Sequence, residues 1–284
     1  MRVAIPDLVS PSYFPLIAAV ELGFLDAKLD LLYPVTKTYE ELRDGRLDLV
    51  GGAAHAPLYA FKDWQGCRLL CALAQNMYWF LVVNKKLAVR GLPEVNGLRI
   101  GAAPGPADGL KQMLKREGIE AQVGPVPGVV GEKASFGLMA AQALQEGKID
   151  AFWANGMGAE IAVRNGVGAV VLDARRDGTD EWKGYTFPAL VSRSDMKPET
   201  ARMAIRAVAA AQDALKKDPG RATAIGRKLF PAAEAELIAE LIRRDLPYYD
   251  PGISPKTFAS MNRFAKDLGL LSKNVSYEDV VWKN

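Results

Sequence analysis

Two stretches of the chain have nearly the same pattern. Leu42–Leu49 reads LRDGRLDL, and Leu144–Ala151 reads LQEGKIDA. Each stretch has the form of a helix end, a glycine suited to a left-handed cap, a basic residue, and an aspartate that leads into an apolar strand. Small residues follow both strands. We therefore expect two similar α/β lobes, which suits a chain of 284 residues on the usual relation between length and domain number.

Strand-like and helical segments alternate around both copies of this pattern. Arg2–Pro6 is a short β-like run, Leu16–Leu25 is helical, and Leu47–Gly51 is a buried strand. Such alternation predicts parallel sheets with helices on their faces. The last third of the chain is helical and adds no sheet; its expected helices are 198–217, 221–229, 232–246 and 255–268.

The connections between the lobes predict how the domains are arranged. Two β-rich runs, Met77–Asn84 and Tyr185–Ser192, flank the second copy of the pattern. We therefore expect a discontinuous lobe I, made of residues 1–82 and 188–284, and an inserted lobe II of residues 83–187. Two crossing strands would form the hinge, and the helical C-terminal section would cover lobe I.

Composition excludes several kinds of partner and chemistry. Lysine and arginine number 36 and aspartate and glutamate 33, and this small excess is scattered, so we expect no nucleic-acid partner. No run reaches the length of a membrane-spanning helix, so we expect no membrane insertion. With one histidine, His55, and two cysteines, Cys67 and Cys71, an ordinary zinc site and a disulfide framework are excluded. We expect no metal and no cofactor.

Three segments together resemble a known family. Tyr13–Leu25, an alanine-rich helix that runs into Glu-Leu-Gly-Phe, is similar to the opening helix of the sulfonate/nitrate/taurine and thiamine-pyrimidine solute-binding proteins. Leu42–Asp48 resembles the Leu-x-x-Gly-x-x-Asp signature of that family, and Gly147–Ala151 resembles its counterpart in the second lobe. The resemblance implies a type II periplasmic-binding-protein fold whose lobes close on a small molecule.

The same resemblance implies a biological setting. The family delivers its solutes to the permease of an ABC transporter, so a permease is the expected partner, and we expect a monomer. The stretch Met1–Asp7 contains a proline and an aspartate where a signal peptide needs an apolar run. The expected location is therefore the periplasm if a signal was removed, and the cytoplasm if Met1 is the native start.

A ligand of an open α/β sheet binds beyond the carboxyl ends of the strands. In lobe I the candidates follow the first and third strands or lie at the first hinge run: Ser10, Ser12, Tyr13, Phe14, Ala53, His55, Asn76 and Trp79. Tyr185, at the start of the second hinge run, is a further candidate. The serines can instead be ordinary helix caps, and His55 can be structural or can donate to a carboxylate. Adjacent residues of a strand point to opposite faces, so at most one of Tyr78 and Trp79 should face the cleft.

In lobe II the candidates begin the helices: Pro104, Gly105, Asp108, Phe136, Trp153 and Asn155. A helix N-terminus after a glycine favours anions, but the prolines remove donors and Asp108 already supplies negative charge, which weakens the case for phosphate. Trp153 offers a stacking surface, and Asn155 offers a donor and an acceptor. The many aromatic candidates favour a planar or aromatic small molecule, or an anionic organic one.

No catalytic constellation is visible in the sequence. There is no Gly-x-Ser-x-Gly elbow and no cysteine–histidine pairing, and Asp48 and Asp150 lie at strand starts, away from the expected cleft. We therefore name no catalytic residue and expect a binding protein. The alternative is a cytoplasmic enzyme on the same fold, a decarboxylase, a dehydratase or a pyrimidine-biosynthesis-like enzyme acting on a small organic acid, with His55 or Ser10 in acid–base work.

Overall fold

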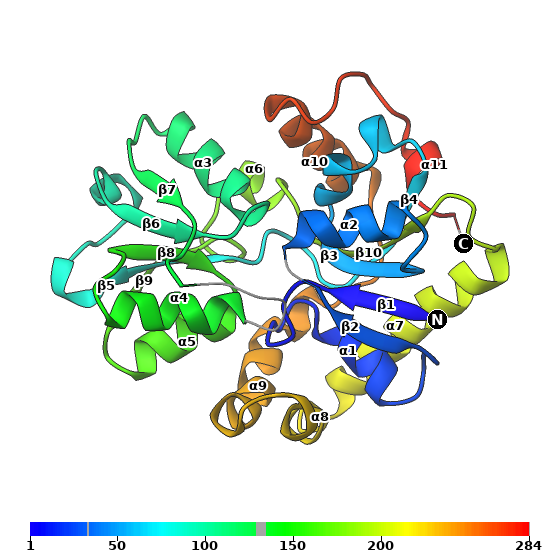
Figure 1. Ribbon diagram of the computed structural model, residues 1–284, viewed down its shortest axis with the longest axis horizontal. Coiled ribbons are helices and arrows are strands. Elements are labelled where there is room, and N and C mark those ends of the chain that lie inside the picture. Colours follow the sequence, from blue (N-terminus) through cyan, green and yellow to red (C-terminus); the bar gives the residue numbers. More distant parts are fainter. Residues whose placement is uncertain (33, 129–134, 284) are drawn as a thin grey trace.

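The protein contains two five-stranded sheets that lie side by side (Figure 1). The computed structural model describes residues 1–32, 34–128 and 135–283. The strand orders are β2-β1-β3-β10-β4 in the first sheet and β7-β6-β8-β5-β9 in the second. The strands are β1 Arg2–Ile5, β2 Lys28–Leu31, β3 Leu49–Ala53, β4 Cys67–Ala72, β5 Phe80–Asn84, β6 Arg99–Ala102, β7 Gln122–Gly124, β8 Ala151–Ala154, β9 Gly168–Asp173 and β10 Pro188–Arg193.

Both sheets have the same topology. In each, the strand in fourth place runs antiparallel to both of its neighbours: β10 between β3 and β4, and β5 between β8 and β9. The remaining pairs are parallel. Each antiparallel strand is also the one that the chain enters directly after crossing from the other sheet. The two sheets are therefore matched units, each completed by a strand that arrives from the far side.

Helices pack on both faces of each sheet (Figure 1). They are α1 Phe14–Glu21, α2 Val35–Arg43, α3 Pro106–Arg116, α4 Phe136–Gln145, α5 Gly156–Arg164, α6 Asp180–Lys183, α7 Pro198–Lys217, α8 Arg221–Leu229, α9 Ala232–Asp245, α10 Pro255–Asp267 and α11 Tyr277–Val280. The sequence predicted α7 and α8 to the residue, and α9 and α10 each end one residue earlier than expected. Among the described residues, no helix is both long and apolar enough to cross a membrane.

The repeated sequence pattern has one structural role in both sheets. In each copy the glycine after the helix adopts a positive φ, 75° in the first and 70° in the second. The aspartate that follows accepts a backbone N–H from the neighbouring strand: Asp48 from Arg2 at 2.8 Å, and Asp150 from Arg99 at 3.0 Å. These arginines begin β1 and β6. The pattern therefore ends a helix and fixes the start of two adjacent strands.

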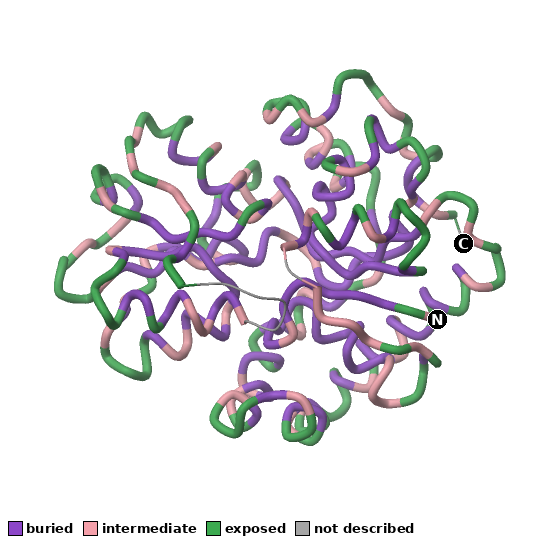
Figure 2. The backbone as a smooth tube through the Cα atoms, in the orientation of Figure 1, coloured by how far each residue is buried: buried purple, intermediate pink, exposed green. Residues whose placement is uncertain are grey.

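Burial follows the strands, while exposed residues lie mostly on outer helix faces and loops (Figure 2). Every residue of β3 and of β8 is buried. Cys67 and Cys71 are both buried and free. The centre of each sheet is thus a closed apolar layer.

Two segments cross between the sheets: residues 73–79, which lead from β4 to β5, and residues 174–187, which lead from β9 to β10. The expected β runs from Met77 and from Tyr185 are wrong in their first three residues, because the strands begin only at Phe80 and Pro188. Asn76 has a positive φ of 64°, which interrupts an extended path. The crossing segments are therefore irregular just before each strand.

Candidate functional site

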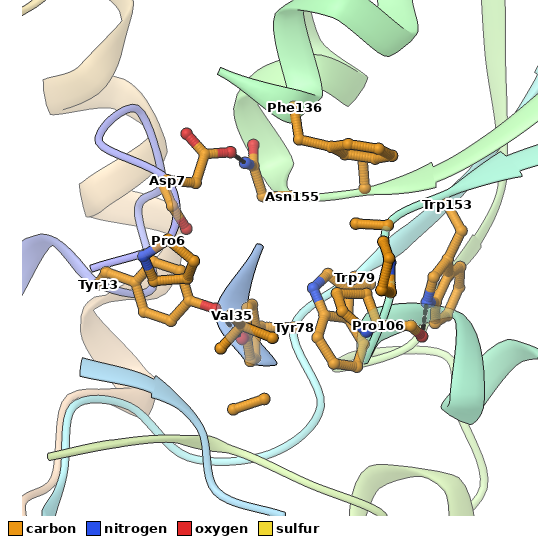
Figure 3. Close-up of a pocket in the computed structure, with 15 residues that line it drawn as sticks. Pro6, Asp7, Tyr13, Val35, Tyr78, Trp79, Pro106, Phe136, Trp153 and Asn155 are labelled. Carbon is orange, nitrogen blue, oxygen red and sulfur yellow. Dashed lines mark hydrogen bonds between the residues drawn. The ribbon is translucent and has the colours of Figure 1, made fainter. Parts of the chain in front are cut away.

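A pocket lies at the carboxyl ends of strands from both sheets, the place where open α/β sheets bind ligands. Its cavity volume is about 40 Å³, and the empty space reaches about 500 Å³ when the open mouth is counted. The loop after β1, the start of α2 and the end of β3 form one wall, and the loop after β6, the start of α4 and the end of β8 form the other. Residues of the first crossing segment form the floor between them (Figure 3).

Eight of the candidate residues line this pocket, namely Ser10, Tyr13, Ala53, Trp79, Pro104, Phe136, Trp153 and Asn155. Seven further lining residues were not among the candidates: Pro6, Asp7, Val35, Tyr78, Ala103, Pro106 and Ala154. The other candidates lie elsewhere: Ser12, Phe14, His55, Asn76, Gly105, Asp108 and Tyr185. Residues from the ends of four strands thus lie together in the pocket. Several candidates that adjoin them in the sequence do not line it.

Packing explains why several candidates lie outside the pocket. Phe14 is fully buried and meets Phe230 edge to face, with 6.1 Å between the ring centroids. The Ser12 hydroxyl faces Arg175, whose guanidinium nitrogen lies 3.3 Å away. Tyr185 stacks on Phe264 at 4.5 Å. These three side chains are buried in the protein core and do not line the pocket.

Asn76 and Gly105 contribute backbone shape in place of pocket contacts. Both have a positive φ, 64° and 87° respectively. Gly105 is the N-cap of α3, and it lines a shallow neighbouring groove that Asp108 also lines. Both residues turn the chain, and neither lines the pocket in which direct ligand contact was expected.

His55 and Asp108 meet outside the pocket. His55 Nδ1 lies 2.9 Å from Thr186 Oγ1, and Nε2 lies 3.7 Å from Asp108 Oδ2. Tyr59 donates a hydrogen bond to the same carboxylate. Burial raises the pKa of Asp108, but the contacts with His55 and Tyr59 outweigh it and hold the pKa below its usual value. This pair joins the end of β3 to α3, and neither residue lines the pocket.

Among the described residues, five aromatic rings line the pocket. They are Tyr13, Tyr78, Trp79, Phe136 and Trp153 (Figure 3). The expectation that only one of Tyr78 and Trp79 faces the cleft is wrong, because these residues precede β5 and do not alternate as a strand would. Their rings lie 4.6 Å apart between centroids. A flat solute would meet aromatic faces on several sides.

Hydrogen bonds fix the polar atoms of this wall. The hydroxyls of Tyr13 and Tyr78 lie 2.5 Å apart, and burial raises the pKa of both phenols. The Trp153 indole donates to the carbonyl of Pro106 at 3.0 Å. Ser10 Oγ is buried and has no hydrogen-bond partner among the described residues. Ser10 therefore keeps a donor and an acceptor for a bound solute.

Asp7 is a charged lining residue that sequence reasoning missed. Its carboxylate accepts from Asn155 Nδ2 at 2.7 Å (Figure 3). It also accepts from Ser135 Oγ at 3.1 Å and from the Val9 N–H at 3.0 Å. It follows the first strand at the same sheet edge as Ser10, so its position was a usable signal. Asp7 thus links the first wall of the pocket to the second.

Asp7 predicts a pH dependence of stability. Burial raises its pKa from 3.8 to about 6, although its hydrogen bonds oppose the shift. The folded protein therefore binds this proton more tightly than the unfolded chain does, and the resulting stability is full below about pH 4 and lost as the pH rises through 6. When the pH is lowered from 8 to 4, the free energy of unfolding of wild type should rise by roughly 1–3 kcal/mol relative to that of Asp7→Asn. Unfolding in urea measures both values.

A second carboxylate supplies a control of opposite sign. The hydrogen bond from Arg99 lowers the pKa of Asp150, so its contribution to stability is lost as the pH falls. Wild type compared with Asp150→Asn should lose stability over the same interval. A parallel trend for the two comparisons would contradict the role assigned to Asp7.

Two glycines let α4 and α5 approach closely beside Asp7. A Cβ atom at Gly158 would lie 2.6 Å from the carbonyl oxygen of Gly137, which no real contact allows. Gly158→Ala should therefore lower the free energy of unfolding by about 1–3 kcal/mol through overpacking. Gly124→Ala is the control, since a Cβ there meets nothing within 4 Å. Equal effects of the two substitutions in urea denaturation would refute this explanation.

Comparison with known proteins places the fold. No family model matches the chain, and no curated protein matches it. Among solved structures, a protein from Bordetella bronchiseptica RB50 is 20% identical, with 99% of this chain and 93% of that one covered and a TM-score of 0.78. The alkanesulfonate-binding protein SsuA from Xanthomonas axonopodis pv. citri, bound to MOPS, is 16% identical, with 99% and 97% covered and a TM-score of 0.72.

An enzyme shares this likeness. A variant of the desulfurization enzyme DSZB, in complex with biphenyl-2-sulfinic acid, is 17% identical, with 97% of this chain and 94% of that one covered and a TM-score of 0.65.

The chain has the type II periplasmic-binding-protein fold, the fold of the SsuA alkanesulfonate-binding proteins. The fold expected from the sequence resemblance is confirmed.

Proposed function

We propose that the protein is a solute-binding protein that closes two lobes on a small planar, aromatic molecule and delivers it to the permease of an ABC transporter. The observation that carries this proposal is the pocket between the two sheets, whose wall contains five aromatic rings. Ring faces bind flat solutes through burial and stacking. The likeness to sulfonate-binding proteins supports the binding role.

The described residues of the pocket favour the aromatic solute over an anionic one. They include no lysine, arginine or histidine, and their one carboxylate belongs to Asp7. An anion moved into this pocket would lose its hydration without gaining a counter-charge from the described lining residues. MOPS, the molecule bound by the Xanthomonas protein, carries a sulfonate, so the solute proposed for this chain differs in charge.

The proposal includes a division into lobes. The expected boundary between residues 82 and 83 falls inside β5, whose partners β8 and β9 both belong to the second sheet. We therefore set lobe I as residues 1–79 and 188–284, and lobe II as residues 80–187. Ligand binding would close them by a hinge motion of the two crossing segments. We propose that the protein acts as a monomer in the periplasm.

A binding screen tests this function. Indole and benzamide should raise the melting temperature of the purified protein, and mass spectrometry under native conditions should detect a co-purified solute. Trp79→Ala should weaken binding at least tenfold, because it removes a wall of the pocket. Trp282→Ala, which removes a ring outside the pocket, should leave the affinity unchanged. Stabilisation by nitrate or taurine, with no response to aromatic molecules, would contradict the proposal.

The likeness to the enzyme DSZB supports a second candidate function. In this alternative, the protein is an enzyme of the same fold that acts on a small organic acid. Ser10 is the one hydroxyl side chain besides the tyrosines among the described lining residues, and its Oγ has no hydrogen bond to a base in the described part of the chain. Incubating the protein with the identified solute and following its mass decides between the two functions. Turnover that Ser10→Ala abolishes would establish the enzyme, and an unchanged solute supports the binding protein.

A further inference from the structure

The first turns of α4 and α5 meet at one corner of the pocket. Ser135 is the N-cap of α4, and Asn155 is the N-cap of α5. Asn155 Oδ1 accepts the N–H groups of Met157 and Gly158 at 3.0 and 3.3 Å. Helix N-termini attract anions, because their N–H groups point outward and carry partial positive charge. We call this place, defined by Ser135, Asn155 and the first turns of the two helices, the anion corner.

The anion corner is already filled by a carboxylate. Asp7, from the loop after β1, accepts hydrogen bonds from both N-cap side chains, from Asn155 at 2.7 Å and from Ser135 at 3.1 Å. Its side chain is buried, and the Val9 N–H on its own loop supplies a further bond at 3.0 Å. Such charge-assisted bonds to a carboxylate are stronger than neutral ones. An anion tethered to one sheet thus sits on the helices of the other.

This arrangement has a consequence for the charge of the solute. At pH 8, two units above the pKa of about 6, Asp7 is ionised. Among the described residues that line the pocket, no cationic side chain offsets it. The other titratable groups there are the phenols of Tyr13 and Tyr78, whose pKa values burial raises, so neither changes charge near neutral pH. A second anion would meet repulsion in a site of low dielectric.

We propose that Asp7 is a specificity-determining residue, because its carboxylate takes the place of a solute anion at the N-termini of α4 and α5. The pocket therefore rejects anionic solutes and accepts an uncharged or cationic aromatic molecule. The aromatic character of the solute rests on the proposed function. The occupied anion corner does not, and it can be tested with ring-free anions.

Chemical rescue tests the anion corner directly. Asp7→Ala vacates the space of the carboxylate, and formate has the size and charge to refill it. At pH 8 and constant ionic strength, formate should raise the melting temperature of Asp7→Ala by several degrees in a saturable way, whereas chloride should not. Wild type should bind formate at least tenfold more weakly than Asp7→Ala.

Asp108→Ala is the matched control, since it removes another carboxylate between the sheets that does not line the pocket. It should show no formate response. An equal response from Asp108→Ala, or none from Asp7→Ala, would overturn the anion corner whatever the aromatic screen gives.

A pair of ring probes tests the selectivity. Benzamide and benzoate have the same ring and nearly the same shape but differ in charge. Wild type should bind benzamide at least tenfold more tightly than benzoate at pH 8, and Asp7→Asn, which keeps the shape of the side chain, should narrow that ratio severalfold. Equal affinities in wild type would overturn the selectivity and leave the proposed function standing. If neither probe binds wild type, the aromatic solute is refuted, and formate rescue still decides the role of Asp7.

Discussion

Trp153→Ala should lower the free energy of unfolding by about 3–5 kcal/mol, the usual range for removing a buried tryptophan. Trp153 lies on β8, the central strand of the second sheet, and its side chain is fully buried. In wild type the carbonyl of Pro106 accepts the indole N–H at 3.0 Å. The substitution removes this donor as well. Unfolding in urea followed by far-UV circular dichroism measures the loss.

Two further variants separate the contributions of the ring. Trp153→Phe keeps most of the apolar contact and removes only the hydrogen bond to Pro106, so its effect should be smaller than that of Trp153→Ala. Trp182→Ala makes the same chemical change at a half-buried position in α6 and should also have a smaller effect. If Trp182→Ala destabilises as much as Trp153→Ala, burial in the central strand is not the cause.

The pocket should lose affinity for aromatic probes in Trp153→Ala, because Trp153 forms part of its wall.

Arg175→Ala should lower the free energy of unfolding by about 3 kcal/mol, the low end of the range for breaking a buried ion pair. The Arg175 side chain is almost fully buried, and it contacts Asp245 at 2.7 Å and Ser12 at 3.3 Å. Its guanidinium also lies 4.9 Å from the ring centroid of Tyr248. The low end applies because Arg176 still contacts Asp245 at 3.1 Å and partly neutralises it.

Two comparisons test the role of Arg175. Arg175→Lys keeps the charge but not the planar fork that reaches both partners, so its effect should be intermediate. Arg227→Ala breaks an exposed pair with Glu236 and should change stability little, as exposed pairs do. Equal losses for Arg175→Ala and Arg227→Ala in urea unfolding would show that burial of the pair does not matter. A normal unfolding slope must accompany each value for the comparison to hold.

The fold could be predicted because its signals are local. A helix end, a left-handed glycine and an aspartate ahead of a strand lie within eight residues, and both copies of the pattern perform the same task at Arg2 and Arg99. The helical C-terminal third was equally readable from its periodicity. The starts of β5 and β10 were not, because apolar and aromatic residues before Phe80 and Pro188 look the same in a strand and in an irregular buried segment.

The pocket could be predicted only in part, because its walls are brought together by tertiary contacts. The rule that ligands meet the ends of strands selected Ser10, Trp153 and Asn155 correctly as lining residues. The same rule selected His55, which instead lies against Thr186 beneath the surface. Asp7 was passed over because a single carboxylate near an N-terminus has no local mark of burial. Its partners lie 128 and 148 residues away in the chain.

The ring of Tyr78 has neighbours in two separate compartments. It lines the aromatic pocket, and it also lines a groove beside α5 and α9 that Arg244 and Asp245 line as well. The Arg175 guanidinium lies 5.9 Å from the centroid of the same ring. Because Tyr78 lines both spaces, a smaller side chain at this position should widen the pocket and the groove together.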